Sequence, residues 1–167
     1  MLIREEKKDD QDAVYAVNES AFETSSEASL VAALREQAGP IISLVAEDDG
    51  EVVGHIMFSP VSLSDHPELK IMGLGPIAIA PAFQHKGIGS ALVRAGIERC
   101  RELEFGAIVV LGHQKFYPRF GFLPASRFGI KAEYDVPEDV FMAMELQPNY
   151  LRRAAGTIKY HDAFGQL

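Results

Sequence analysis

The first third of the chain switches between the hydrophobic period of a strand and that of a helix. Residues 2–5 (LIRE) predict a short opening strand. Residues 9–22 then carry apolar side chains at roughly helical spacing behind aspartates that suit the positive end of a helix. Residues 25–37 (SSEASLVAALREQ) show an apolar helical stripe again, and we expect Ser25 or Ser26 to cap it. The chain therefore opens with a strand and two amphipathic helices.

Two apolar runs follow within residues 41–63, and they flank the dipeptide Asp49-Gly50. An Asp-Gly pair between apolar runs is a strong signal for a tight turn between antiparallel strands. This part of the sequence predicts a β-hairpin.

The next apolar run, residues 70–81 (KIMGLGPIAIAP), reads as a strand that Gly73, Gly75 and Pro76 interrupt. Proline cannot donate to a strand ladder, and glycines inside strands often mark bulges or a close backbone approach. We expect a local break in pairing that leaves backbone groups free for a ligand. A plain edge strand is the alternative.

The remaining pattern adds one long helix and several strands. Residues 87–104 have an apolar face at helical spacing, and we expect Gly106 to end this helix. Residues 107–111 (AIVVL) are continuously apolar, as in a strand buried on both faces. Residues 141–146 read as another strand, and the tail from residue 156 adds a last one. The order of elements predicts an α/β or α+β fold, with a mixed sheet and helices on its faces.

Composition narrows the class of partner. The chain has 167 residues, which suits a single domain spanning residues 1–167, and 47% of them are hydrophobic. The net charge of −8 argues against nucleic acid, whose binders carry basic patches, and against an anionic membrane surface. A small anionic ligand remains compatible, because local backbone amides can outweigh a remote negative field.

The cysteine content and the start of the chain indicate the cytoplasm. The one cysteine, Cys100, cannot form a disulfide within the chain, and we interpret it as a buried helical thiol rather than a nucleophile. Residues 1–12 are charged and lack an apolar segment of signal-peptide length. No stretch reaches the ~20 apolar residues of a membrane span.

Glycines at the start of the long helix raise the question of an anionic ligand. A dinucleotide fingerprint fits poorly, because Leu92 stands at its third glycine position. A P-loop fails, because Lys86 precedes the glycines instead of following them. A third pattern, Gln/Arg-x-x-Gly-x-Gly/Ala at a helix start, is matched by Gln84, Gly87 and Gly89.

This third pattern resembles motif A of the GNAT N-acetyltransferase superfamily, which holds the pyrophosphate of acetyl-CoA. Residues 77–92 (IAIAPAFQHKGIGSAL) look like the family's strand, turn and helix, and residues 116–122 (FYPRFGF) are similar to the end of its motif B. The resemblance covers residues 1–146 and is sharp over 71–123. It implies a mixed, mostly antiparallel central sheet with a bulged fourth strand and helices on both faces. The closest likeness is to the family's poorly characterised bacterial small-molecule acetyltransferases.

The resemblance also implies a set of cofactor-binding residues. Orphan N–H groups in the first helical turn and the helix dipole suit a pyrophosphate, and glycine removes the Cβ atoms that would keep it away. In the family, the pantetheine arm pairs with the backbone of the bulged strand. The implied set is Ile77, Ala78, Ile79, His85, Lys86, Gly87, Ile88, Gly89 and Ser90. The alternatives are a solvated loop charge at Lys86 and a plain core strand at residues 77–79.

Catalytic candidates follow from the same comparison. Tyr117 stands where the family's usual general acid stands, and a phenol can protonate a departing thiolate. His113 replaces an asparagine common in the family, so it is either the base or a structural hydrogen-bonding group. His55 is a further candidate base. Glu27 either binds a cationic amine or only complements the helix dipole.

The resemblance implies an acetyl-CoA-dependent N-acetyltransferase that transfers the acetyl group directly to a primary amine of a small molecule. The alternatives are a non-catalytic acyl-CoA-binding module, which acts as a sensor or protein partner, and a protein or peptide acetyltransferase. The five histidines lack metal-binding spacing, so we expect no metal. A homodimer is expected at the level of the family.

Overall fold

The computed structural model describes residues 1–166 and divides into two compact units. Unit 1 comprises residues 1–59, 75–99 and the segment from residue 161 onwards, and unit 2 comprises residues 60–74 and 100–160. The helices are α1 (Gln11–Ala21), α2 (Ser26–Gln37) and α3 (Ile88–Glu102). The strands are β1 (Leu2–Glu5), β2 (Ile42–Asp48), β3 (Glu51–Leu63), β4 (Ile71–Ile79), β5 (Ala107–Leu111), β6 (Leu123–Pro124), β7 (Ile130–Ala132), β8 (Phe141–Glu145) and β9 (Gly156–Lys159).

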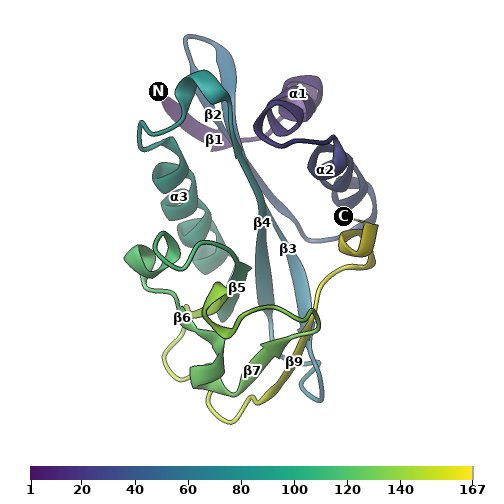
Figure 1. The fold of residues 1–167 in the computed structure, drawn as a ribbon, viewed down its shortest axis with the longest axis vertical. Coiled ribbons are helices and arrows are strands. Elements are labelled where there is room, and N and C mark those ends of the chain that lie inside the picture. The colour runs from purple at the N-terminus through teal and green to yellow at the C-terminus, as the bar shows by residue number, and fades with distance from the viewer. Residues whose placement is uncertain (167) are drawn as a thin grey trace. The chain divides into compact units, whose positions relative to one another are not determined.

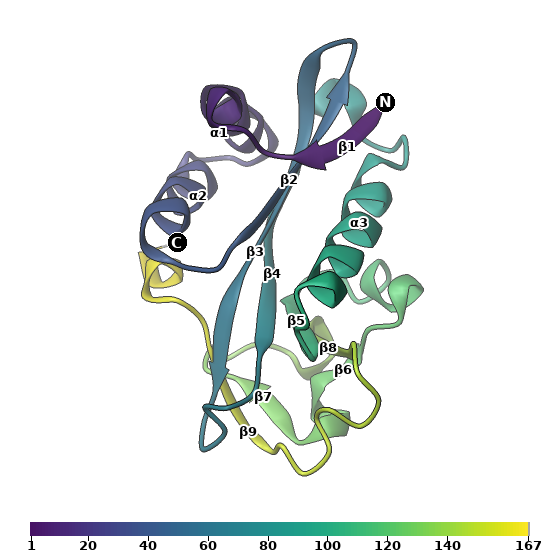
Figure 2. The ribbon, with the colours of Figure 1, turned by 180° about the vertical axis from the view of Figure 1, so that it is seen from behind.

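Unit 1 has helices on both faces of its strands (Figures 1 and 2). Side chains of a strand alternate between faces, and β3 follows this rule. Met57 packs with Val14 and Leu30 in the core under α1 and α2. Phe58, the next residue, points the other way, and its ring closes over Gly96 of α3. The predicted placement of helices on the sheet faces is therefore correct for this unit.

The predicted hairpin is the centre of the unit 1 sheet. β1 pairs with β2 and β2 pairs with β3, both antiparallel. Asp49 and Gly50 form the turn and both have positive φ, 49° and 79°. This geometry is the reason that an Asp-Gly pair is favoured here.

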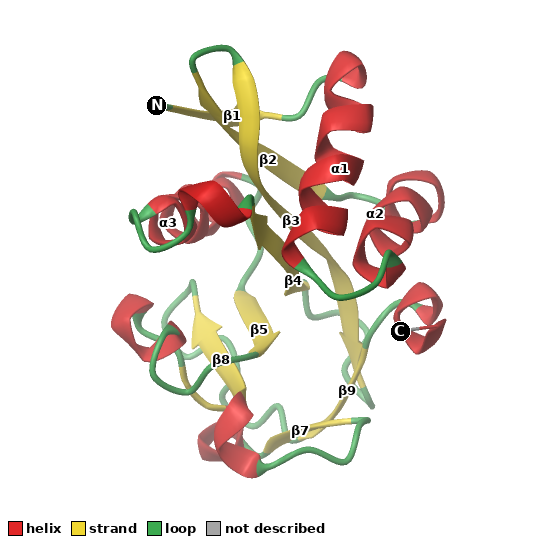
Figure 3. Ribbon diagram, turned by 45° about the horizontal axis from the view of Figure 1, so that its top comes forward, coloured by secondary structure: helices red, strands yellow, loops and turns green. Residues whose placement is uncertain are grey.

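The two opening helices form an α-hairpin, in which the end of α1 and the start of α2 lie side by side (Figure 3). Our expectation for the cap of α2 was wrong. Ser25 takes the N-cap position but its side chain makes no capping hydrogen bond. Thr24 Oγ1 instead accepts a hydrogen bond from the Ser26 backbone N–H at 3.2 Å. A Ser/Thr-rich start offers several capping hydroxyls, and the pattern does not choose between them.

Unit 2 contains the strands of the second half of the chain. β4 pairs with β5 in parallel over Ile71–Leu74, β5 pairs with β8, and β8 pairs with β6. The end of β3 pairs with β9, and β9 pairs in parallel with β7. Antiparallel pairs thus predominate, as expected. The short strands β6 and β7 were not predicted, because two or three residues carry too little periodicity.

The end of α3 differs from our expectation. The residue in the left-handed conformation is Glu104, with φ of 64°, and not Gly106. Gly106 instead allows the ring of Tyr150 to pack closely against the backbone, because a Cβ at this position would lie 2.2 Å from that ring. Its N–H donates to Lys70 O at 2.9 Å. A glycine near a helix end was therefore mistaken for its cap.

Two further expectations concern burial and membranes. Cys100 is fully buried, and burial raises the pKa of its thiol to about 12, so the interpretation as a buried helical thiol is confirmed. Within residues 1–166, none of the helices is both long enough and apolar enough to cross a membrane.

Candidate functional site

The glycine turn connects the end of β4 to the start of α3 in unit 1. The Gln84 side chain donates from Nε2 to the Ile79 carbonyl at 3.1 Å, which ties the turn back to the strand. His85 and Gly87 both have positive φ, 63° and 83°. A glycine takes this conformation without strain. The motif residues therefore shape the backbone before any ligand contributes.

The turn is open to solvent at the point where α3 begins. His85, Lys86 and Gly87 are exposed, and a Cβ at Gly87 would meet no atom within 4 Å. The first helical hydrogen bond runs from Ala91 N–H to Gly87 O at 3.1 Å. The amides of residues 88–90 precede it and belong to the orphan donors of a helix start. The geometry suits an anion, which these amides and the helix dipole would bind.

The side chains around the turn divide into packing and solvent-facing groups. Ile88 is buried, so only its backbone faces the helix start. Gly89 and Ser90 are half-buried. The Lys86 ammonium lies 5.5 Å from the centroid of the Phe83 ring, which holds it near the turn. Such a cation–π contact contributes about 0.5–1 kcal/mol at an exposed site.

The strand residues that precede the turn are mostly covered by protein. Ala78 is buried, and Ile77 and Ile79 are half-buried. Their apolar side chains pack, so any contact with a ligand would come from their backbone groups.

Tyr117 lies in unit 2, at the start of a short 3₁₀ helix, Tyr117–Phe120. Its ring packs edge-on against Phe116 and Phe122, with centroids 5.0 and 5.7 Å away. It also lies directly over Gly112, where a Cβ would come within 2.3 Å of Cε2. Burial raises the pKa of the phenol to about 12, so the hydroxyl carries its proton across the neutral range.

His113 begins the turn that leads to Tyr117. Its carbonyl accepts hydrogen bonds from the backbone N–H groups of Phe116 and Tyr117, at 3.0 and 3.3 Å. Its ring is exposed and lines an open cavity of about 680 Å³, between residues 111–115 and the pair Val136 and Val140. The histidine is thus accessible to a solute.

Glu27 stands in the first turn of α2 in unit 1. Its Oε2 is shielded from solvent and makes no hydrogen bond, although the residue as a whole is only half-buried. A shielded carboxylate oxygen without a donor is costly, and a donor from a bound molecule would relieve this cost.

His55 does not fit the role of base. It is fully buried, its Nδ1 accepts a hydrogen bond from Asn18 Nδ2 at 3.1 Å, and its Nε2 bonds Ser43 Oγ at 2.8 Å. Burial, with the charge of Arg35, lowers its pKa to about 3. Both ring nitrogens are engaged, and the ring resists protonation. The hypothesis that His55 accepts the proton of the reaction is therefore wrong.

The same burial predicts a pH dependence of stability. In the unfolded chain the His55 ring takes up a proton below its ordinary pKa of 6.5, whereas in the fold it stays neutral down to about 3. The stabilisation that the neutral His55 ring provides is fully present above pH 6.5. It is lost as the pH falls below that value, at up to about 1.4 kcal/mol per pH unit. Urea unfolding between pH 6.5 and 3.8 measures this slope, because the lowered pKa of Asp10 acts only below its ordinary value of 3.8.

The variant His55→Gln is the control for this slope. Its side chain does not titrate, so the variant starts less stable and loses less stability between these two pH values. Equal slopes in both proteins would contradict the prediction.

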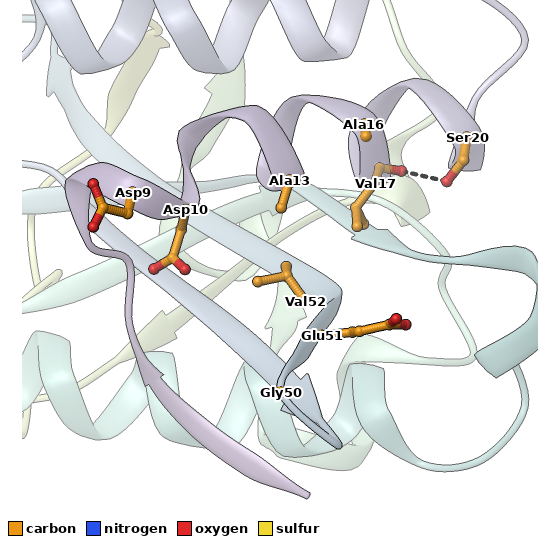
Figure 4. Close-up of a pocket in the computed structure, with 9 residues that line it drawn as sticks. All are labelled: Asp9, Asp10, Ala13, Ala16, Val17, Ser20, Gly50, Glu51 and Val52. Carbon is orange, nitrogen blue, oxygen red and sulfur yellow. Dashed lines mark hydrogen bonds between the residues drawn. The ribbon is translucent and has the colours of Figure 1, made fainter.

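Unit 1 has a hollow of about 610 Å³ between α1 and the β2–β3 turn (Figure 4). Its floor is apolar, with Ala13, Val17 and Val52. Asp10 at its edge is already paired with Arg4 at 2.7 Å. The hollow collects none of the predicted site residues. Among residues 1–166, no three His, Cys, Asp or Glu side chains converge as metal ligands would.

Sequence reasoning missed Asn18 and Tyr160, which are both buried. Asn18 was passed over although an amide on the buried side of α1, one turn after Val14, is an unusual core residue. Tyr160 was assigned to the tail, yet it is buried and its ring occupies the space beside Gly73. Burial raises the pKa of this phenol, and the neighbouring Tyr134, Glu133 and Tyr117 raise it further. Tyr160 thus belongs to the surroundings of Tyr117 in unit 2.

Comparison with known proteins identifies the family. Residues 6–122 match the acetyltransferase (GNAT) family. The chain is 33% identical over 168 residues to YhbS of Escherichia coli K12, described as an uncharacterised N-acetyltransferase, with full coverage of both chains. The structure of E. coli YhbS in complex with CoA aligns with a TM-score of 0.93 at 32% identity, over 99% of this chain and 92% of that one. A GNAT acetyltransferase from Brucella melitensis in complex with acetyl-CoA aligns with a TM-score of 0.80 at 34% identity, over 98% and 97%. The chain belongs to the GNAT family of acetyltransferases.

Proposed function

We propose that this acetyltransferase works in the cytoplasm as a single catalytic domain, and that it transfers the acetyl group of acetyl-CoA directly to a primary amine of a small molecule. The observation that carries this proposal is the exposed glycine turn at the start of α3, where Gly87 has a φ of 83° and open space in front of it. The CoA and acetyl-CoA bound to the similar proteins from E. coli and B. melitensis support the choice of anion.

In this proposal the backbone amides of residues 87–90 hold the pyrophosphate, and the side chains of His85 and Lys86 approach it from the solvent side. Backbone groups of Ile77, Ala78 and Ile79 pair with the pantetheine arm. A backbone N–H of this strand stabilises the thioester oxygen, which becomes anionic when the amine attacks. Attack forms the C–N bond and breaks the C–S bond, without an acyl-enzyme.

Two protons move during the transfer. Tyr117 gives its phenolic proton to the departing thiolate, and the raised pKa of this phenol keeps it protonated until that moment. The attacking amine gives up a proton, and His113, exposed beside its cavity, is the proposed acceptor, directly or through water. Glu27 attracts the cationic amine before the reaction.

The test is release of free thiol from acetyl-CoA across a panel of polyamines, amino acids, amino sugars, aminoglycosides and short peptides. Turnover with a small amine supports the proposal. Turnover with peptides alone would replace the small-molecule acceptor by a protein or peptide. Thermal stabilisation by acetyl-CoA without turnover of any panel member would favour a binding module instead.

A further inference from the structure

The cavity of about 680 Å³ that His113 lines has room for more than an amine. Pockets of about 300–1,000 Å³ are typical of sites for small molecules. Besides His113, the cavity is lined by Leu111, Gly112, Gln114, Lys115, Val136 and Val140. Apart from three polar side chains on one segment, the wall is therefore apolar. A cavity of this size and lining suits the body of a small acceptor molecule.

Backbone hydrogen bonds hold the two sides of this cavity together. β5 and β8 are antiparallel neighbours, with Leu111 opposite Phe141 (Figure 3). The next residue, Gly112, donates its N–H to Val140 O at 2.9 Å. The Val140 N–H donates in turn to Pro137 O at 3.2 Å, in the short 3₁₀ turn before β8. The apolar wall is thus fixed by the ends of two paired strands before any ligand binds.

The cavity adjoins both residues that transfer a proton in the proposed function. His113 lines it directly. The Tyr117 ring lies over Gly112, which also lines it, and a Cβ at Gly112 would come within 2.3 Å of Cε2 of that ring. The backbone N–H of Tyr117 donates to His113 O at 3.3 Å. A molecule in this cavity would therefore contact the proposed base and the residue that the proposed acid covers.

Lys115 is the side chain of this cavity that the proposed function does not use. It is exposed, and within residues 1–166 it makes no ion pair. Two acidic residues of the segment before β8, Asp135 and Glu138, line a smaller cavity of about 260 Å³ instead. In a chain with a net charge of −8, a lysine without a carboxylate partner is left able to bind an anionic group of a ligand.

We infer that this cavity binds the body of the acceptor and selects amino acids with an apolar side chain. The side chain of the acceptor packs against Leu111, Val136 and Val140. Lys115 binds its carboxylate, and its amine faces His113. This inference rests on the proposed function and extends it, because it names the class of acceptor and makes Lys115 a specificity-determining residue.

Amino acids match these residues better than other small amines do. A polyamine brings a second positive charge, which Lys115 repels and which an apolar wall does not solvate. A phosphate group brings up to two negative charges, whereas the cavity supplies one lysine beside an acidic segment, residues 135–139. A carboxylate matches the single charge of Lys115. The apolar wall then selects among amino acids for those with an apolar side chain.

The test compares amino acids with the amines that remain when the carboxylate is removed. The pairs are phenylalanine with phenethylamine and leucine with isoamylamine. Glycine lacks the apolar body, and spermidine is a polycation. Release of free thiol from acetyl-CoA gives kcat/KM for each compound. In at least one pair the wild type should prefer the amino acid, and glycine and spermidine should each be used at least about 10-fold less efficiently than that amino acid.

Lys115→Gln removes the charge and Lys115→Glu reverses it. The measured quantity is the ratio of kcat/KM for the amino acid to kcat/KM for its decarboxylated amine. Lys115→Gln should lower this ratio about 5-fold, and Lys115→Glu should lower it further and favour the decarboxylated amine. Each protein is measured with the same two amines, so their different basicities cancel between proteins.

Lys131→Gln is the matched control. Lys131 is another exposed lysine of unit 2, and it lines the smaller cavity instead. This variant should keep the wild-type ratio. All three substitutions change exposed side chains, and the Tm of each free protein verifies that it folds.

The outcomes separate this inference from the proposed function. The inference is overturned if neither phenylalanine nor leucine is turned over, if the wild type prefers the decarboxylated amine in both pairs, or if the preference for the amino acid survives in Lys115→Glu. Turnover of another small amine in any of these cases leaves the proposed function intact. Stabilisation by acetyl-CoA without turnover of any amine would overturn this inference and favour a binding module.

Discussion

Gly89→Glu is expected to abolish the response of the protein to acetyl-CoA. Residue 89 lies in the first turn of α3, among the amides that precede the first helical hydrogen bond. A glutamate there places its own carboxylate at the positive end of the helix and repels the pyrophosphate. We expect kcat/KM for acetyl-CoA to fall at least about 100-fold, which is roughly 2.8 kcal/mol of binding free energy. Thermal stabilisation by acetyl-CoA should disappear with it.

The unliganded variant provides an internal check. Glutamate has a better helix propensity than glycine and suits a first helical turn, so the free protein should be as stable as the wild type or more stable. If acetyl-CoA no longer stabilises the variant while the free variant is as stable as the wild type or more stable, the loss is specific to the anion site. A variant that merely misfolds would lose both.

Gly89→Ala is the matched control, because it adds a Cβ without a charge. The motif allows alanine at this position, so this variant should keep most of its response to acetyl-CoA. If both variants lose their response to acetyl-CoA equally, the effect comes from the shape of the added side chain and not from its charge. An unaffected Gly89→Glu would show that the pyrophosphate does not bind at this turn.

The features that sequence reasoning found are those encoded within a few residues. The Asp49-Gly50 turn follows from the backbone preferences of two neighbours, and both have the positive φ that this turn needs. The exposed glycine turn at residues 84–90 likewise follows from a local motif. Even there the structure adds a detail, because Gln84 serves the turn itself through its bond to Ile79 O.

The features that sequence reasoning missed depend on contacts between distant residues. Asn18 and His55 are 37 positions apart, and nothing near either residue indicates that they meet. His55 therefore looked like a free base, although the fold uses both of its nitrogens. Glu104, two residues after the end of α3, has a left-handed conformation that is uncommon for a glutamate, so the nearby Gly106 was the better guess from the sequence and the wrong one.

The order of the long helices and strands was predicted correctly, but the short strands β6 and β7 and the roles of some single polar residues were not. Hydrophobic periodicity is summed over a whole element, so one unusual residue does not alter the outcome. A polar side chain has its role set by one or two partners, and those partners are chosen by the tertiary fold. For this reason the sequence left two interpretations open for Glu27 and two for His113. The burial and hydrogen bonding of these residues had to be known before a role could be argued for either.

Tyr117→Phe is expected to slow acetyl transfer about 10²- to 10⁴-fold, the usual contribution of a general acid. The exchange removes the phenolic oxygen and keeps the ring that packs against Phe116 and Phe122 and covers Gly112. Affinity for acetyl-CoA and the KM for the amine should change little. The expected signature is a lower kcat with unchanged thermal stabilisation by acetyl-CoA.

The pH dependence of the rate sharpens this prediction. Only the protonated phenol is an acid, and burial raises its pKa from 10.0 to about 12, so its protonated fraction stays constant through the neutral range and up to about pH 10. The ratio of wild-type to variant rate should therefore be flat over that range and should decrease only as the pH approaches 12.

Tyr150→Phe is the control, because it removes another phenol of unit 2, one that accepts a hydrogen bond from Lys70 N–H at 2.7 Å. That control should lose about 1 kcal/mol of stability and keep its kcat. An unchanged rate in Tyr117→Phe, or an equal loss in Tyr150→Phe, would exclude Tyr117 as the acid.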